Sequence, residues 1–199
     1  MSHSKILRIF DVDGVLVESE YANFVSLKKV ANDFDMDLTK AEDLMLGPIP
    51  TTEKLKYLEQ KYARSFSHDE VQSFFKSKFD YLKENFSHIS INPHARLTIK
   101  KFFDRGDIIA IVSNARTEYI NIIVDLLGIE EFVDIYLGND SGFRTKPNPD
   151  MFLWLARKYL LKPEQCYIYE DCPKNVELVQ KVGFRPVIIK SFDDLRNVD

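Results

Sequence analysis

Residues 9–19 read IFDVDGVLVES: a short apolar run ends abruptly in two aspartates, Asp11 and Asp13, which are followed by Gly14. Two carboxylates this close at the end of a buried strand repel each other unless positive charge lies between them. The apolar run predicts a strand over residues 5–10, and the next comparable run is IIAIV at 108–112. The fold therefore depends on the segment between these two strands and on the elements after the second.

After residue 112 the sequence alternates between helical and strand patterns. Helices are predicted at 117–128, 149–160 and 173–183, and strands at 133–139, 166–170 and 185–190. Short β-rich apolar runs that alternate with helices imply crossover connections and a parallel sheet. The pattern predicts an α/β fold: a Rossmann-like parallel sheet with helices on both faces.

Between residues 20 and 88 every apolar pattern has the period of a helix instead. Apolar side chains recur every three or four residues over 21–34, 55–62 and 71–86, and helix-start signals occur at Thr52 and at Ser67 with Glu70. This is far more helix than one crossover requires. We predict an inserted all-helical cap domain over 17–89 and an α/β core domain made of 1–16 and 90–199.

Composition and charge narrow the functional class. The chain has 199 residues, 45% of them hydrophobic, and a formal net charge of −4 without a basic surplus, which argues against nucleic-acid binding. Cys166 and Cys172 form no disulfide framework, and no apolar run approaches the ~18 residues of a membrane span. We expect a cytoplasmic monomer that binds neither membranes nor nucleic acids.

Polar side chains follow several predicted strands at their carboxyl ends, where open parallel sheets bind ligands. A loop residue, Lys146 in TKPNPD, completes this set. The strand-end residues are Asp11, Asp13, Ser113, Asn114, Glu170 and Asp171.

These residue types point to phosphoryl transfer. Converging carboxylates require a cation, and all-oxygen ligands suit Mg²⁺; no histidine follows a predicted strand, which argues against zinc. Lys146 would supply a mobile positive charge, and Ser113 and Asn114, at the start of the following helix, would supply a hydroxyl and backbone N–H groups; together they would meet the charge of a phosphate. Asp11 could then attack phosphorus, and Asp13 could transfer the protons. A P-loop kinase is excluded because no GxxxxGK motif occurs.

With these residues, the chain resembles the haloacid dehalogenase superfamily, in its branch with a helical cap inserted after the first motif. Four motifs match in order: DVDGV (11–15), VSN (112–114), Lys146 in KPNPD, and YEDCPKN (169–175). With the elements between them, they cover essentially the whole chain.

The resemblance implies a role for each matching residue. Asp11 would be the nucleophile that becomes phosphorylated, and Asp13 the general acid and base, with its backbone carbonyl on Mg²⁺. Ser113 would hold a phosphoryl oxygen with help from the Asn114 backbone, and Lys146 would bridge the nucleophile and the phosphoryl group. An aspartate at position 13 favours phosphate esters over haloacids and phosphonates.

The metal would be held by Asp11, Asp13 and Asp171, with Glu170 bound directly or through water. We therefore expect a Mg²⁺-dependent hydrolase, a phosphatase of a small phosphorylated metabolite, acting through an aspartyl-phosphate on Asp11. The alternatives are a phosphotransferase or sugar-phosphate mutase of the same family, or a non-catalytic binding protein that retains the fold.

Substrate choice is assigned to the cap, where we expect contacts from Tyr21, Phe24, Gly47 and Ile49. Mutases of the family carry an arginine shortly after the glycine of this loop, whereas here Gly47 is followed by PIP. The missing arginine weakens the mutase alternative and leaves the substrate open.

Overall fold

The computed structural model describes residues 5–47 and 49–198, and the chain divides into two compact units. One unit contains the residues up to Glu18 and those from Ile91 onward, and the other contains Ser19–Ser90. Each unit has its own hydrophobic core. The second unit is therefore inserted between Glu18 and Ile91 of the first unit, after β1 (Leu7–Phe10).

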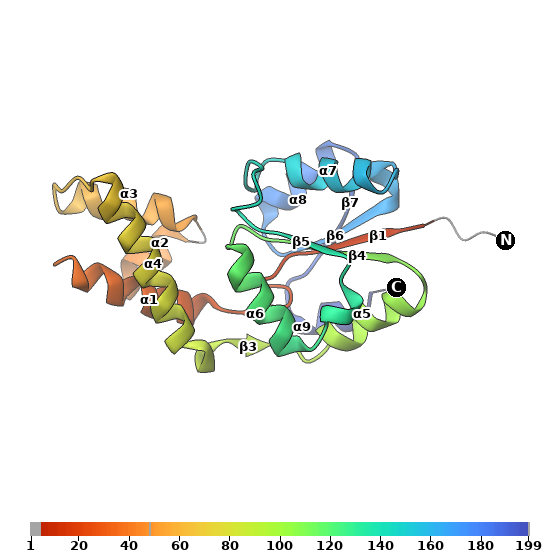
Figure 1. Cartoon of the computed structure of the whole chain (residues 1–199), viewed down its shortest axis with the longest axis horizontal. Helices are drawn as coiled ribbons and strands as arrows, with labels where there is room; N and C mark the ends of the chain where they lie inside the picture. Colours follow the sequence, from red (N-terminus) through yellow and green to blue (C-terminus); the bar gives the residue numbers. More distant parts are fainter. Residues whose placement is uncertain (1–4, 48, 199) are drawn as a thin grey trace. The chain divides into compact units, whose positions relative to one another are not determined.

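The first unit is built on a five-stranded sheet in the order β5-β4-β1-β6-β7 (Figure 1). Each neighbouring pair is parallel, as the sequence predicts. β1 lies at the centre, where Leu7 pairs with Ile108 on one side and with Cys166 on the other. The strands are β1 (Leu7–Phe10), β4 (Ile108–Val112), β5 (Ile135–Leu137), β6 (Cys166–Glu170) and β7 (Arg185–Ile188).

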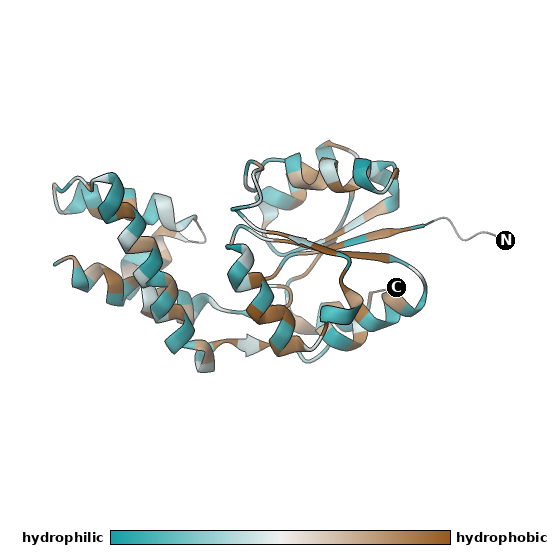
Figure 2. Ribbon diagram, in the orientation of Figure 1, coloured by the Kyte–Doolittle hydropathy of each residue, from teal (hydrophilic) through white to brown (hydrophobic). Residues whose placement is uncertain are grey.

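Helices cover both faces of this sheet, which confirms the predicted α/β class. The layer above the sheet in Figure 1 consists of α7 (Asp150–Lys158) and α8 (Pro173–Lys181). The layer below consists of α5 (Ala95–Asp104), α6 (Thr117–Leu127) and α9 (Phe192–Arg196). Figure 2 shows mostly hydrophobic strands between helices along which hydrophobic and hydrophilic residues are mixed.

Side chains of β1 alternate between these two layers. Leu7 and Ile9 belong to the core that α7 and α8 cover. Arg8 faces the other layer, where its buried guanidinium lies 3.6 Å from the centre of the Phe102 ring. Asp107 accepts a hydrogen bond from Arg8 Nε at 2.7 Å, so that this buried charge is paired.

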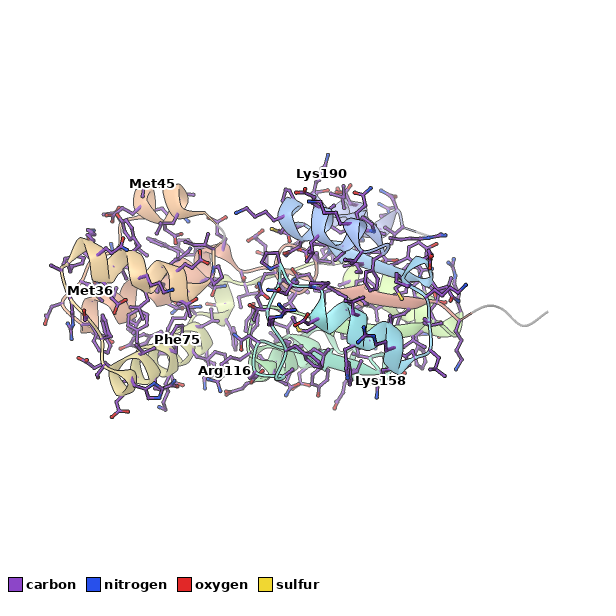
Figure 3. All side chains as sticks on the ribbon, turned by 90° about the horizontal axis from the view of Figure 1, so that it is seen from above. Met36, Met45, Phe75, Arg116, Lys158 and Lys190 are labelled. Carbon is purple, nitrogen blue, oxygen red and sulfur yellow. The ribbon has the colours of Figure 1, made fainter. Side chains whose placement is uncertain are left out.

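The second unit consists of α1 (Glu20–Asp33), α2 (Lys40–Leu46), α3 (Thr51–Lys61) and α4 (His68–Glu84). Its core includes Met36 and Phe74, and the partly buried Phe75 packs against this core; Met36 and Phe75 are labelled in Figure 3. The Ser67 side chain accepts a hydrogen bond from Glu70 N, and the Glu70 side chain accepts one from Ser67 N, as the helix-start signal predicts. This capping box defines the beginning of α4.

Several element boundaries differ from the predicted ones. α3 begins at Thr51 after Pro50, so Thr52 lies inside the helix. Phe34 and Phe86 lie just beyond α1 and α4 rather than within them, and neither α2 nor α9 was predicted. The remaining elements are short: β2 (Val17–Glu18), β3 (Ser90–Ile91), η1 (Phe86–His88), η2 (Glu130–Phe132) and η3 (Pro163–Gln165). Within the described ranges, the structure has no helix that is long and apolar enough to cross a bilayer.

Candidate active site

The three adjacent strands β4, β1 and β6 bring the predicted site residues together at their carboxyl ends. Asp11 follows β1 directly, and its backbone N–H donates to Tyr169 O at 3.0 Å. Ser113 follows β4, and Glu170 is the last residue of β6. All three side chains are buried.

Lys146 connects the carboxylates of two of these strands. Its Nζ lies 2.6 Å from Asp11 Oδ2 and 2.9 Å from Glu170 Oε2. Burial lowers the pKa of the ammonium group, but the two carboxylates outweigh it and raise that pKa well above its ordinary value. The sequence suggested a mobile positive charge here; this expectation is wrong, because Lys146 is only 3% exposed and is held by both carboxylates.

The backbone of Lys146 is held in turn by the side chain of Asn114. Asn114 Nδ2 donates to Lys146 O at 2.9 Å, and Lys146 N donates to Asn114 Oδ1 at 2.8 Å. Asn139 Nδ2 donates to Asn114 O at 2.9 Å. The side-chain amide of Asn114 therefore positions the loop that carries Lys146 (the lysine loop), a role that the sequence did not suggest. Only the backbone of Asn114 remains available to contact a phosphate.

Glu170 is fully buried and its two carboxylate oxygens are both used. Oε2 accepts from Lys146, Oε1 accepts from Cys172 N at 3.1 Å, and the Asn175 side chain also bonds to this carboxylate. Burial raises the pKa of Glu170, but the charge of Lys146 and these hydrogen bonds outweigh burial and lower it. Glu170 is therefore an ionised partner of the lysine.

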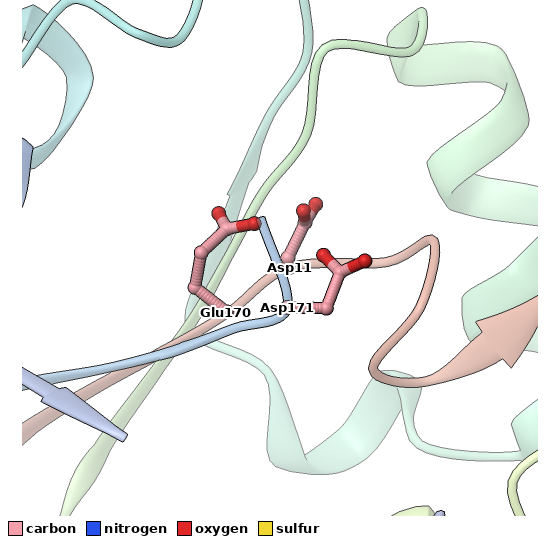
Figure 4. Close-up of side chains that lie close together, drawn as sticks. All are labelled: Asp11, Glu170 and Asp171. Atoms are coloured by element: carbon pink, nitrogen blue, oxygen red, sulfur yellow. The ribbon is translucent and has the colours of Figure 1, made fainter. Parts of the chain in front are cut away.

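Three carboxylates form a candidate metal centre, shown in Figure 4. Asp11, Glu170 and Asp171 each offer an oxygen, and these atoms lie within 4.8 Å of one another. Burial and the charge of Glu170 raise the pKa of Asp11 well above its ordinary value and that of Asp171 to about 7. Since one lysine cannot neutralise three carboxylates, this all-oxygen donor set fits a hard divalent cation such as Mg²⁺.

Gly14 allows the turn after β1 to pass close to Asp171. Its φ is +80°, and an added Cβ would lie 2.2 Å from Asp171 Oδ2. The turn is closed by a hydrogen bond from Gly14 N to Val17 O at 2.8 Å. A side chain at this position would displace the carboxylate of the candidate metal centre.

Asp13 lies in the same turn, but its carboxylate is not part of the three-carboxylate group found among the described residues. Instead it accepts a hydrogen bond from the hydroxyl of Tyr119, a buried residue of α6, at 2.9 Å. No motif in the sequence identifies Tyr119 as a site residue. The only available signal is its place on the buried face of the helix that follows Ser113.

Ser113 and Asn114 lie in a loop before α6 and not at its first turn, contrary to the expectation that they open the helix. Ser113 Oγ accepts from Ala115 N at 3.0 Å. The helix begins at Thr117, whose N–H and hydroxyl both donate to Asp140 Oδ1. These two donors at the helix start are therefore used by a carboxylate of the protein itself.

The four predicted specificity residues all belong to the second unit. Tyr21 is exposed, with its ring edge-on to His88, whereas Phe24 is buried with Lys40 Nζ 4.8 Å from its ring centre. Gly47 ends α2 with a φ of +70°, and Ile49 is half-buried. Their contact with a substrate stays a prediction.

Comparison with known proteins gives consistent matches along the chain. The haloacid dehalogenase-like hydrolase family matches residues 8–189. The phosphoglycolate phosphatase of Pasteurella multocida is 23% identical over 87% of this chain and 80% of its own length. The phosphorylated carbohydrates phosphatase of Thermotoga maritima is 23% identical over 94% and 86%. The crystal structure of a beta-phosphoglucomutase from Clostridium difficile superposes with a TM-score of 0.79 at 22% identity, covering 98% of this chain and 91% of that one, which shows a shared fold.

Proposed function

Because the chain belongs to the haloacid dehalogenase-like hydrolase family, we propose that it is a Mg²⁺-dependent phosphatase of a small phosphorylated metabolite. The observation that carries this proposal is the buried Lys146, which pairs with Asp11 at 2.6 Å beside a cluster of three carboxylates. Two relatives named as phosphatases support the reaction class. The proposed pathway runs through a phosphorylated Asp11.

In the first step a carboxylate oxygen of Asp11 attacks phosphorus, and the bond between phosphorus and the ester oxygen breaks. Asp13 donates a proton to the departing oxygen, so that an alcohol leaves rather than an alkoxide. In the second step water attacks the phosphorus of the aspartyl-phosphate. Asp13 takes the proton of that water, and Asp11 is regenerated as inorganic phosphate leaves.

The remaining residues stabilise charge during these steps. Lys146 lies against Asp11 and would contact an incoming phosphoryl oxygen, while Glu170 keeps the ammonium charged and in place. Asp11 and Asp171 would hold Mg²⁺, with Glu170 beside them. When bound, the ion supplies positive charge that offsets the negative charge on the phosphoryl oxygens.

The reaction is tested with a panel of phosphate monoesters and p-nitrophenyl phosphate, with and without Mg²⁺. Phosphoglycolate and sugar phosphates come first in the panel because the relatives' names mention them. We expect release of inorganic phosphate that requires Mg²⁺ and is abolished in Asp11→Asn. The matched control is Asp104→Asn, which changes an exposed aspartate of α5.

Three results would contradict the proposal in different ways. Turnover retained in Asp11→Asn would rule out the aspartyl-phosphate. Conversion of a sugar phosphate to its isomer without release of phosphate would indicate a mutase. A protein that turns over no ester at all would be a binding protein that retains the fold.

A further inference from the structure

The hydroxyl of Tyr119 lies at the proposed general acid, although the two residues are far apart in sequence. It donates to Asp13 Oδ1 at 2.9 Å, and Tyr119 is only 2% exposed. The ring belongs to the buried face of α6 together with Ile120 and Ile123. The donor hydroxyl is therefore held in the core of the first unit and does not belong to a mobile surface side chain.

The start of α6 fixes where this hydroxyl lies. Tyr119 is in the first turn of the helix, two residues after Thr117. Asp140 accepts hydrogen bonds from Thr117 N at 2.9 Å and from Thr117 Oγ1 at 2.6 Å. These hydrogen bonds hold the start of the helix against the loop after β5, and so they fix the backbone position of Tyr119.

Asp13 has a constrained backbone, but its side chain needs a separate constraint. Hydrogen bonds from Gly14 N to Val17 O and from Val17 N to Val12 O fix the turn that carries it. They do not determine the rotation of its carboxyl group. A hydrogen bond donated to one carboxylate oxygen restricts that rotation and so the direction in which a proton is exchanged.

We propose that Tyr119 is a positioning residue for Asp13: its hydroxyl holds the carboxyl group in the orientation that delivers a proton to the departing oxygen. This inference rests on the proposed phosphatase function and adds a residue to it. Tyr119 contacts neither the nucleophile nor the ester in this scheme. It acts only through Asp13.

A positioning role of this kind makes a prediction about leaving groups. An alkoxide is a strong base and requires the proton of Asp13, whereas p-nitrophenolate is a weak base and leaves without one. General acid catalysis contributes about 10²–10⁴-fold, and misplacement of the acid forfeits part of this. Tyr119→Phe should therefore slow phosphoryl transfer from an alkyl monoester by about tenfold or more and from p-nitrophenyl phosphate by less than about threefold.

The test measures release of the first equivalent of alcohol or p-nitrophenol in the pre-steady state. This isolates phosphoryl transfer from the later attack of water, which both substrates share. The alkyl substrate is the ester of the panel that the wild type turns over fastest. Tyr167→Phe is the matched control, since it removes a hydroxyl that accepts from the exposed Arg185 at 2.8 Å.

A double-mutant cycle with Asp13→Asn completes the test. If Tyr119 acts through Asp13, Tyr119→Phe should cause no further loss on the alkyl ester once Asp13 is replaced. An equal loss on both substrates, no loss on either, or an additive loss in the Asp13→Asn background would overturn the inference. Failure of the proposed function looks different, because the wild type itself would then release no phosphate.

Discussion

Replacement of Gly14 by alanine is expected to weaken Mg²⁺ binding without unfolding the protein. An added Cβ would lie 2.2 Å from Asp171 Oδ2 and 2.4 Å from Asp171 Cγ. Both distances are far below van der Waals contact, so the methyl group and the carboxylate cannot keep their present positions. Asp171 is the side chain that moves, because it is flexible and the turn of Gly14 is held by backbone hydrogen bonds.

Gly14→Ala has two costs, backbone strain and displacement of the Asp171 carboxylate. A substitution at a second glycine separates them. Alanine at a φ of +80° is strained by about 1–2 kcal/mol. Gly106 has a φ of +84°, and no atom of the described chain lies within 4 Å of a Cβ added there. Gly106→Ala therefore carries similar backbone strain alone, and both variants should lose about 1–2 kcal/mol of unfolding free energy.

The metal affinity should differ between the two variants. Displacement of one carboxylate ligand is expected to weaken Mg²⁺ at least about tenfold, or about 1.4 kcal/mol, in Gly14→Ala only. Calorimetric titration with Mg²⁺ measures this, and urea denaturation measures the shared loss of stability. Wild-type affinity in Gly14→Ala would show that the position of Asp171 does not determine metal binding. An equal loss in Gly106→Ala would assign the effect to general strain.

Further predictions concern proton release, the lysine loop and a buried charge. The pKa of Asp171 is raised from 3.8 to about 7, so Mg²⁺ must displace a proton from this carboxyl group below about pH 7. Mg²⁺ affinity should therefore increase by about tenfold per pH unit for each proton displaced, up to about pH 7, and calorimetry measures this increase. Over the same interval the metal-free protein should become less stable as pH rises, because the native state keeps a proton that the unfolded chain releases. Asn114→Ala, which removes both hydrogen bonds to the lysine loop, should lower kcat about tenfold with little change in KM. Asp107→Ala should lower the free energy of unfolding in urea by about 3 kcal/mol, because it leaves the buried guanidinium of Arg8 without its carboxylate.

The two substitutions have matched controls, and the proton-release prediction has a result that would contradict it. Mg²⁺ affinity that stays flat between about pH 5 and pH 7 would contradict proton release. Asn148→Ala removes one hydrogen bond, to Thr145 O, from the same loop and should leave kcat near the wild-type value. Asp104→Ala breaks an exposed ion pair with Lys100 and should cost less than about 1 kcal/mol. A cost equal to that of Asp107→Ala would show that burial of the Arg8 pair is unimportant.

Local sequence patterns were sufficient to predict the sheet and the strand-end carboxylates. Apolar runs such as 108–112 are strands because their side chains are buried on both faces, and parallel strands bring their carboxyl ends to one edge. Asp11 and Glu170 follow from that rule although they are far apart in the chain. The short helix α2 was missed because Asp43 is its only buried residue, which leaves no apolar stripe to detect. A capping box between Thr39 and Glu42 marks its start and is the available signal.

The direction in which individual side chains point could not be predicted from these sequence patterns. The Asn114 amide turns toward the backbone of Lys146, and the Tyr119 hydroxyl reaches Asp13 from a helix. Both contacts depend on how separate elements pack, which periodicity does not encode. The same reason explains why Lys146 was expected to be mobile: its two carboxylate partners come from β1 and β6, and only the packed sheet brings them to one point.

The central position of β1 has a consequence for synthesis of the chain. β1 pairs with β4 through Leu7 and Ile108 and with β6 through Leu7 and Cys166. Both partners leave the ribosome after the whole of Ser19–Ser90, which forms a compact unit of its own. The helical unit can therefore fold while the first strand is still unpaired, and the sheet closes only when the last third of the chain has emerged. Until then at least one edge of β1 is open to any other strand, which exposes this strand to misassembly during translation.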